Sequence, residues 1–330
     1  MRVFGKWLGR FLLLIAVIGA GAWTFGPYVP VEVNVQFDER KFGEGVQVYF
    51  ESVESQLDDI TEGVEKRVVW AGGTEVKTDI AVLYVHGFSA TSQELRPVPD
   101  RVAEEFGANL VFTRLRGHGR PGDALGEARV EDWMADVAEA LAAARTVGRE
   151  VIVIATSTGC TLVSEALLQP GMAEGVKAVA YVSPNFAIND DKAWILTLPG
   201  ARYWVPLLAG RERAWEPSSD LVAKYWTSRY PMQAAITLAA LVKHAAAQDY
   251  SAVSVPGLFY FSDGDTVVRA GETHRVAGQW GADHGGLATV EMLPDDAQVV
   301  DNRHVIAGYI ASPDNTEATI QVILSWLEGL

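Results

Sequence analysis

Short, uninterrupted apolar runs alternate with longer stretches of helical spacing from about residue 31 to the carboxyl terminus. Residues 80–85 (IAVLYV) and 151–155 (VIVIA) are wholly apolar, which predicts strands buried on both faces. Residues 131–147 are rich in alanine, have a helical period and end before Gly148, which predicts a helix. Further strands are predicted at 68–71, 110–115, 176–182, 257–262 and 289–293, and further helices at 101–106, 158–168, 232–248 and 315–327. The alternation predicts an α/β protein with a mostly parallel sheet and helices on both faces.

The alternation stops in the middle of the chain. Residues 185–249 contain no clear strand, are rich in Trp, Tyr and Leu, and end in a long helical run. We expect them to form a helical cap inserted at one edge of the sheet, between core segments at 31–184 and 250–330. The sequence shows no internal repeat and no low-complexity tract.

The first 30 residues form a separate segment. Three basic residues precede an uncharged stretch at 11–25 (FLLLIAVIGAGAWTF); they are Arg2, Lys6 and Arg10. The small residues at 20–22 resemble a signal-peptide cleavage site, whereas Trp7, Trp23 and Tyr28 bracket the stretch like interfacial aromatics. A helix from Trp7 to Tyr28 would span about 31 Å, close to the thickness of a membrane core. We favour an uncleaved membrane anchor over a removed signal peptide or a helix buried in the globular domain.

Both membrane interpretations place the body of the protein outside the cytoplasm, because positive charge stays on the cytoplasmic side. The sequence therefore predicts an exported protein, held at the membrane by its N-terminal segment or secreted after cleavage.

The composition narrows the class of partner. Hydrophobic residues make up 49% of the 330 residues, enough for one large core with an inserted subdomain. The formal net charge is −15, and an acidic surface repels phosphate backbones, which argues against nucleic-acid binding. Composition determines neither the substrate nor the oligomeric state.

Cysteine and histidine usage argues against disulfides and metal chemistry. Cys160 is the single cysteine, so no intrachain disulfide can form. The six histidines have no zinc-ligand spacing and form no H-E-x-x-H pair, which leaves only a scattered set of ligands as an alternative.

A serine follows one of the buried strands directly. Residues 151–155 run into Thr156-Ser157-Thr158-Gly159, and a predicted helix begins at once. From these residues alone, Ser157 is either an exposed nucleophile or a helix N-cap. The segment resembles the nucleophile elbow of the α/β-hydrolase superfamily, G-x-S-x-G, with Ala155 in place of the first glycine.

Two further motifs resemble the same superfamily. The strand at 80–85 ends in His86-Gly87-Phe88, and the resemblance implies that the backbone N–H groups of Phe88 and Thr158 form an oxyanion hole. His86 is expected to orient this turn. Arg116-Gly117-His118-Gly119 follows another strand, as in monoacylglycerol-lipase-like and carboxylesterase-like members, and His118 is expected to be structural.

The remaining triad residues are implied near the carboxyl terminus. Asp265 lies just past the strand at 257–262, where the superfamily places its acid, with Asp263 as the rival. His304 lies in a loop before the last helix, where the superfamily places its base; His274 and His284 are fallbacks. The order serine, aspartate, histidine is the one expected for this fold.

The resemblance implies a serine esterase of the α/β-hydrolase fold, in which Ser157, His304 and Asp265 hydrolyse a small-molecule or lipid-like ester without a cofactor. Alternatives are an acyltransferase, peptidase or perhydrolase with the same triad, and a non-catalytic protein that retains the fold. Eight cap aromatics either line an apolar acyl pocket or pack the cap on the core; they are Phe186, Trp194, Tyr203, Trp204, Trp215, Tyr225, Trp226 and Tyr230.

Overall fold

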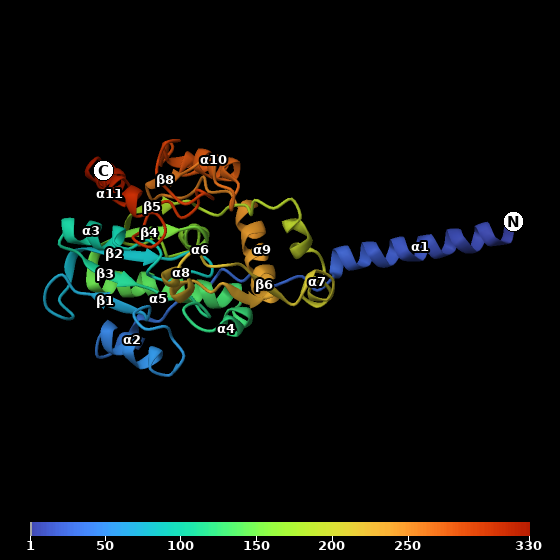
Figure 1. Cartoon of the computed structure of the whole chain (residues 1–330), viewed down its shortest axis with the longest axis horizontal. Coiled ribbons are helices and arrows are strands. Elements are labelled where there is room, and N and C mark those ends of the chain that lie inside the picture. The colour runs from blue at the N-terminus through green and yellow to red at the C-terminus, as the bar shows by residue number, and fades with distance from the viewer. Residues whose placement is uncertain (1) are drawn as a thin grey trace.

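The computed structural model describes residues 2–330, and within them a seven-stranded sheet forms the centre of the molecule (Figure 1). Its strand order is β1-β3-β2-β4-β5-β8-β9, and every neighbouring pair is parallel except β1 with β3. The strands are β1 (Arg67–Val69), β2 (Thr78–Val85), β3 (Asn109–Phe112), β4 (Gly148–Thr156), β5 (Val176–Val182), β8 (Gly257–Phe261) and β9 (Ala288–Met292). The predicted mostly parallel sheet is confirmed. One predicted strand was too long, since β3 ends at Phe112 and not at 115.

Helices cover both faces of this sheet. Along β4, Val151, Val153 and Ala155 pack into one apolar core, whereas Ile152 and Ile154 pack into the other. The first core includes α2 (Val46–Glu54), α5 (Val130–Val147), α6 (Thr158–Leu167) and α10 (Ala270–Gln279), and the second includes α3 (Val98–Glu105) and α11 (Thr316–Glu328). Shorter elements are α4 (Gly122–Glu127), η1 (Glu39–Phe42), η3 (Ala282–His284) and η4 (Pro313–Asn315). Burial on both faces explains why the central strands are continuous apolar runs.

The cap lies between β5 and β8, which are neighbouring parallel strands, so the chain leaves the sheet at the carboxyl end of β5 and re-enters it at the amino end of β8. It contains η2 (Ala193–Thr197), α7 (Ala201–Ala209), β6 (Glu212–Ala214), α8 (Asp220–Tyr225), β7 (Arg229–Pro231) and α9 (Met232–Ala246). The expectation of no strand in this segment was wrong, because β6 and β7 pair antiparallel. Each has only three residues, and β6 is wholly exposed, so neither shows the alternation that marks a strand.

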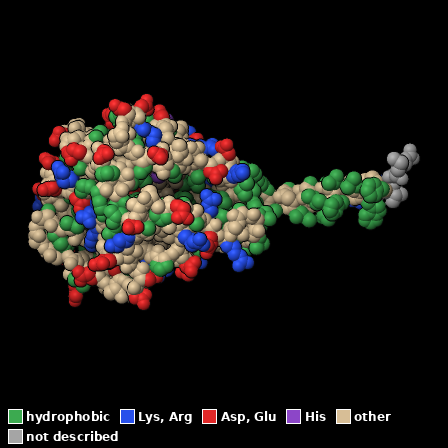
Figure 2. Space-filling view, in the orientation of Figure 1, with side chains coloured by type: hydrophobic (Ala, Val, Ile, Leu, Met, Phe, Trp, Pro, Cys, Tyr) green, Lys and Arg blue, Asp and Glu red, His purple; other side chains and the backbone are tan. Residues whose placement is uncertain are grey.

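The N-terminal helix α1 (Arg2–Phe25) projects away from the body (Figure 1). Its span Phe4–Phe25 has a mean hydropathy of 1.8 and is long and apolar enough to cross a membrane. None of that span is buried, so the alternative of a helix packed inside the globular domain is wrong. Figure 2 shows apolar side chains along α1 and mixed charges over the body. At its end, the Gly200 N–H donates to the Pro27 carbonyl at 3.0 Å, which joins α1 to the cap.

Candidate active site

Ser157 occupies a strained turn between β4 and α6. Its backbone has φ 52° and ψ −117°, a region that L-residues rarely adopt. The turn packs tightly, because a Cβ added at Gly159 would lie 2.3 Å from the Val85 carbonyl oxygen and 2.7 Å from that of His86. Glycine is therefore required two residues after the serine, whereas Ala155 fits inside the core two residues before it. The turn lifts the Ser157 hydroxyl beyond the carboxyl end of the sheet.

The structure brings Ser157, His304 and Asp265 together from three distant segments. His304 Nε2 lies 3.0 Å from Ser157 Oγ, and His304 Nδ1 lies 2.7 Å from Asp265 Oδ2. All three residues are buried. Asp265 Oδ1 accepts the backbone N–H groups of Val267 and Val268 at 2.7 and 2.9 Å. Both carboxylate oxygens are therefore committed, and the carboxylate has a single orientation.

The loop that carries His304 is held by its two preceding residues, which the sequence analysis did not single out. The His304 N–H donates to Asn302 Oδ1 at 3.0 Å. Arg303 has φ 53°, and its guanidinium donates to Ser262 Oγ and to the Pro294 carbonyl. These bonds fix the imidazole opposite the end of β8. The only signal in the sequence was the position of Asn302 and Arg303 directly before the predicted base.

The rival acid and the fallback histidines lie elsewhere. Asp263 Oδ1 pairs with His274 Nε2 at 2.8 Å, and both side chains are exposed. His284 lies in η3 and is also exposed. The structure therefore places Asp265, and not Asp263, against His304.

The two implied oxyanion donors, the N–H groups of Phe88 and Thr158, have no acceptor within residues 2–330. His86 lies behind the Phe88 turn: its Nε2 accepts the Leu115 N–H at 3.1 Å, so Nδ1 carries the proton and donates to the Gly87 carbonyl at 2.9 Å. Burial lowers the pKa of His86 to about 4, which keeps it neutral near pH 7. His86 thus orients the turn from within the core.

His118 is also buried, and its ring packs against His86, Phe88 and Trp133. Burial holds the pKa of His118 well below its usual range, so it is a neutral packing residue. Among the described residues, no group of three or more His, Cys, Asp or Glu side chains is placed to hold a metal ion.

A buried carboxyl that the sequence analysis missed lies beside these turns. Glu94 accepts the Gly87 N–H at 2.7 Å, and burial raises the pKa of Glu94 to about 7. No motif marks this residue, since its partners come from β2 and the following turn.

The cap covers the Phe88 turn directly. The Thr227 N–H donates to the Ser89 carbonyl at 2.7 Å, and the Tyr230 ring meets the Phe88 ring edge-on at 5.3 Å between centroids. Other cap aromatics have different environments: Phe186 is wholly buried, whereas Tyr203 is 70% exposed. The eight aromatics therefore do not form one pocket.

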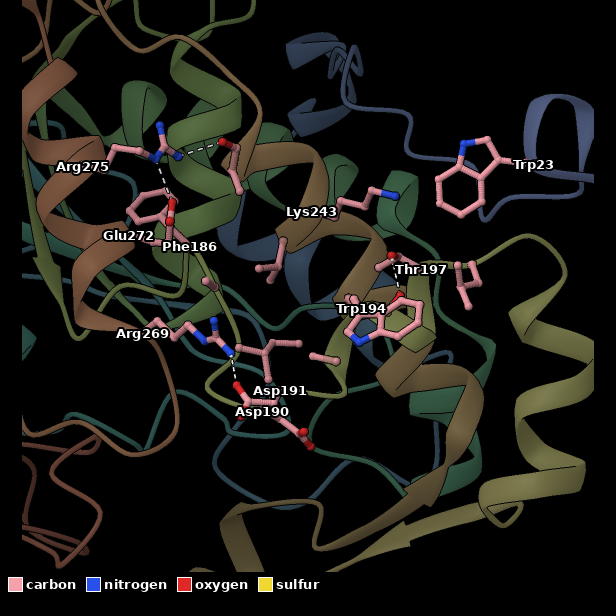
Figure 3. A pocket seen from close by; sticks show the side chains of 17 residues that line it. Trp23, Phe186, Asp190, Asp191, Trp194, Thr197, Lys243, Arg269, Glu272 and Arg275 are labelled. Atoms are coloured by element: carbon pink, nitrogen blue, oxygen red, sulfur yellow. Dashed lines mark hydrogen bonds and ion pairs between the residues drawn. The ribbon is translucent and has the colours of Figure 1, made fainter. Parts of the chain in front are cut away.

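A cavity of about 950 Å³ lies between the cap, α10 and the end of α1 (Figure 3). Trp23, Phe186 and Trp194 line it together with the aliphatic residues of α9. Its charged lining includes two ion pairs, Arg269 with Asp191 and Arg275 with Glu272. Ser157, Asp265 and His304 are not among its lining residues, so this cavity lies beside the triad cluster and not over it.

The parallel sheet, the strained serine turn and the histidine loop are the features of an α/β hydrolase. A family model described as "Alpha/beta hydrolase family" matches residues 82–308, and the chain belongs to this family. A thermostable monoacylglycerol lipase from Bacillus sp. (strain H-257) is 31% identical over 83 residues, which cover 25% of this chain and 33% of that enzyme. The alignment thus spans about a third of the length of this relative.

Solved structures share the fold at low identity. The metagenome-derived lipolytic enzymes LipS and LipT are represented by a chain with a TM-score of 0.62 and 19% identity, with 82% of this chain and 100% of that chain covered. Monoacylglycerol lipase from Paleococcus ferrophilus has a TM-score of 0.55 and 13% identity, with 80% and 98% covered. A soluble variant of monoglyceride lipase from Saccharomyces cerevisiae has a TM-score of 0.56 and 12% identity, with 80% and 91% covered.

Proposed function

We propose that this chain is a serine hydrolase that cleaves carboxylic esters through an acyl-enzyme on Ser157. The observation that carries the proposal is the continuous hydrogen-bonded path from Ser157 Oγ to His304, at 3.0 Å, and on to Asp265, at 2.7 Å. The same fold occurs in proteins of different activity, so the activity is inferred from the residues of the site. A buried serine hydroxyl that is hydrogen-bonded to an imidazole, which is in turn hydrogen-bonded to a carboxyl group, is the arrangement that activates a nucleophile.

In the first half of the reaction, Ser157 Oγ attacks the ester carbonyl and His304 Nε2 accepts the hydroxyl proton. Asp265 accepts a hydrogen bond from the Nδ1–H of His304, stays ionised, and stabilises the imidazolium as it forms. The carbonyl oxygen becomes an oxyanion, which the free N–H groups of Phe88 and Thr158 stabilise. The C–O bond to the alcohol breaks, the alcohol leaves with the proton from His304, and the acyl group stays on Ser157.

In the second half, His304 Nε2 takes a proton from water, and the resulting hydroxide attacks the acyl carbonyl. The Ser157–acyl bond breaks, Ser157 recovers its proton from His304, and the carboxylic acid is released. This cycle needs no group beyond the residues of this chain and water.

We further propose lipid-like esters as the substrates and α1 as a membrane anchor. The names of the relatives, monoacylglycerol lipases among them, support this substrate class. The contact between Gly200 and Pro27 holds the cap at the end of α1, next to the membrane surface that α1 would define. In α7, Leu207 and Leu208 are 73% and 79% exposed, as expected for side chains that face lipid.

The proposed organisation is an anchor at 1–30, a core at 31–184 and 250–330, and a cap at 185–249, with the core and cap outside the cytoplasm. If the segment is instead a cleaved signal, the mature protein begins near residue 23 and leaves the membrane fraction. Membrane fractionation and N-terminal sequencing of the full-length protein expressed in bacteria distinguish these outcomes.

The experiment for the activity is a panel of chromogenic esters of graded acyl length, with the full chain in detergent. We expect turnover that rises with acyl length in the wild type and a loss of at least about 1,000-fold in Ser157→Ala. Exposed Ser325 in α11 provides the matched control, Ser325→Ala, with unchanged turnover. Full turnover in Ser157→Ala would contradict the mechanism, and rates that do not rise with acyl length would contradict the lipid-like substrate.

A further inference from the structure

The carboxyl of Glu94 lies behind the turn that carries the proposed oxyanion donor Phe88. Glu94 is 3% exposed, and its Oε2 accepts the Gly87 N–H at 2.7 Å. A Cβ added at Gly87 would lie 3.0 Å from Glu94 Oε1 and 3.1 Å from Ser157 Cβ. The Glu94 carboxyl and the nucleophile therefore flank the same glycine, one residue before Phe88.

A second contact connects Glu94 to the nucleophile turn. The Tyr84 hydroxyl donates to Glu94 Oε2 at 3.2 Å and lies 3.1 Å from Thr156 Oγ1. Thr156 immediately precedes Ser157, and Tyr84 is wholly buried. The path Gly87–Glu94–Tyr84–Thr156 thus joins the two turns that hold the Phe88 and Thr158 N–H groups. These turns follow different strands, β2 and β4, so their relative position depends on side-chain contacts of this kind.

Burial of the Glu94 carboxyl in this position costs free energy of folding. It forms no salt bridge within residues 2–330, and burial raises its pKa to about 7, although the Gly87 N–H, His304 and the Tyr84 hydroxyl act in the opposite direction. Tyr84 faces it from β2, the neutral thiol of Cys160 from α6 and His304 from the carboxyl-terminal loop. A buried carboxyl with no cationic partner destabilises a fold, and such residues are concentrated at functional sites.

We propose that Glu94 is a positioning residue that sets the relative placement of the two oxyanion donors, through Gly87 on one side and Tyr84 and Thr156 on the other. This inference rests on the proposed function, since it assigns Glu94 to the same reaction. Glu94 does not contact the reacting atoms; it acts through the Gly87–Phe88 peptide. An oxyanion needs donors at about 2.7–3.1 Å, and the oxyanion exists only after nucleophilic attack. A displaced donor therefore lowers kcat and leaves KM almost unchanged.

The test compares kcat and KM for a soluble short-chain ester in the full-length wild type and four variants. Glu94→Ala removes both hydrogen bonds, and we expect kcat to fall about 10- to 100-fold with KM changed less than about 3-fold. Glu94→Gln has the shape of the uncharged carboxyl and keeps an acceptor for Gly87, so we expect kcat within about 5-fold of wild type. Tyr84→Phe removes the hydroxyl that links Glu94 to Thr156 and leaves the Gly87–Glu94 hydrogen bond, and we expect about a 5-fold loss in kcat. The control, Glu104→Ala on the exposed side of α3, should match the wild type.

A fluorinated ketone that adds to Ser157 gives an independent measurement, because its adduct places an oxyanion in the same position. Its inhibition constant should rise in Glu94→Ala by about the factor by which kcat falls. A wild-type kcat in Glu94→Ala, or a loss in KM alone, would overturn the proposal. If Glu94→Ala does not fold, Tyr84→Phe decides, and wild-type kcat in that variant overturns it. An inactive wild type that the ketone does not inhibit contradicts the proposed function itself and is thereby distinguished from failure of the Glu94 assignment.

Discussion

Replacement of Asp265 by asparagine tests the role of the carboxylate with almost no change in shape. Asp265 Oδ1 accepts hydrogen bonds from the backbone N–H groups of Val267 and Val268, and Oδ2 accepts a hydrogen bond from the Nδ1–H of His304. An asparagine must keep its oxygen toward the two N–H donors, since an amide nitrogen there would face two protons. Its NH₂ group therefore points at His304 Nδ1, which must become an acceptor. The remaining imidazole proton moves to Nε2, 3.0 Å from Ser157 Oγ.

His304 can then no longer accept the serine proton. We expect kcat to fall by about 10³- to 10⁴-fold, which corresponds to about 4–5.5 kcal/mol of lost transition-state stabilisation. The wrong tautomer leaves the pocket intact, so KM and the melting temperature should change little. The assay is steady-state hydrolysis of a soluble ester, with circular dichroism to verify folding. The exposed acid Asp263 provides the control, because Asp263→Asn alters a surface pair with His274 and should retain full activity.

An Asp265→Asn variant with more than about a tenth of wild-type kcat would refute the tautomer argument. A large loss in Asp263→Asn, with Asp265→Asn active, would transfer the role of the acid to Asp263.

Three further outcomes follow from the geometry of the site. Gly159→Ala places a methyl group 2.3 Å from the Val85 carbonyl oxygen, and this oxygen belongs to the backbone, which cannot easily move aside. We expect a loss of about 2–4 kcal/mol in the free energy of unfolding, measured with urea, and a loss of activity. A stability equal to that of the wild type would contradict this packing. Burial raises the pKa of Glu94 to about 7, so its contribution to the free energy of unfolding is greatest at low pH and is lost as pH rises through 7. Glu94→Gln has no such titration, and its free energy of unfolding should gain up to about 3 kcal/mol relative to wild type between pH 5 and 8. A difference in melting temperature that stays constant over this range would count against the argument. His86 gives the opposite pH dependence of stability, because burial lowers its pKa to about 4. Its contribution to the free energy of unfolding is present above its ordinary pKa and is lost as pH falls through 4. The wild type should therefore lose more stability than His86→Gln between pH 6.5 and 4.

The central strands could be predicted from the sequence because burial on both faces leaves a strong signal. The wholly apolar runs at 80–85 and 151–155 fall inside β2 and β4, the two strands that lead into the Phe88 turn and the Ser157 turn. The hairpin of β6 and β7 could not, because each strand has only three residues and none of them is buried, which leaves no periodicity.

The candidate site was predictable where a motif ties a residue to a strand end, and less so where placement depends on distant contacts. The residues after β8 offered both Asp263 and Asp265, and only the folded loop shows which of them faces His304. Glu94 was missed because its importance arises from the Gly87 N–H and the Tyr84 hydroxyl, which the sequence does not place beside it. Likewise, aromatic composition could not separate buried Phe186 from exposed Tyr203.

The most direct measurement is covalent labelling of the full-length protein by a fluorophosphonate, followed by intact mass and peptide mapping. The account predicts one probe per chain, attached to Ser157, with no labelling in Ser157→Ala and much slower labelling in His304→Ala. A probe attached to another residue, or no labelling of folded protein that still hydrolyses esters, would contradict the assignment of Ser157 as the nucleophile.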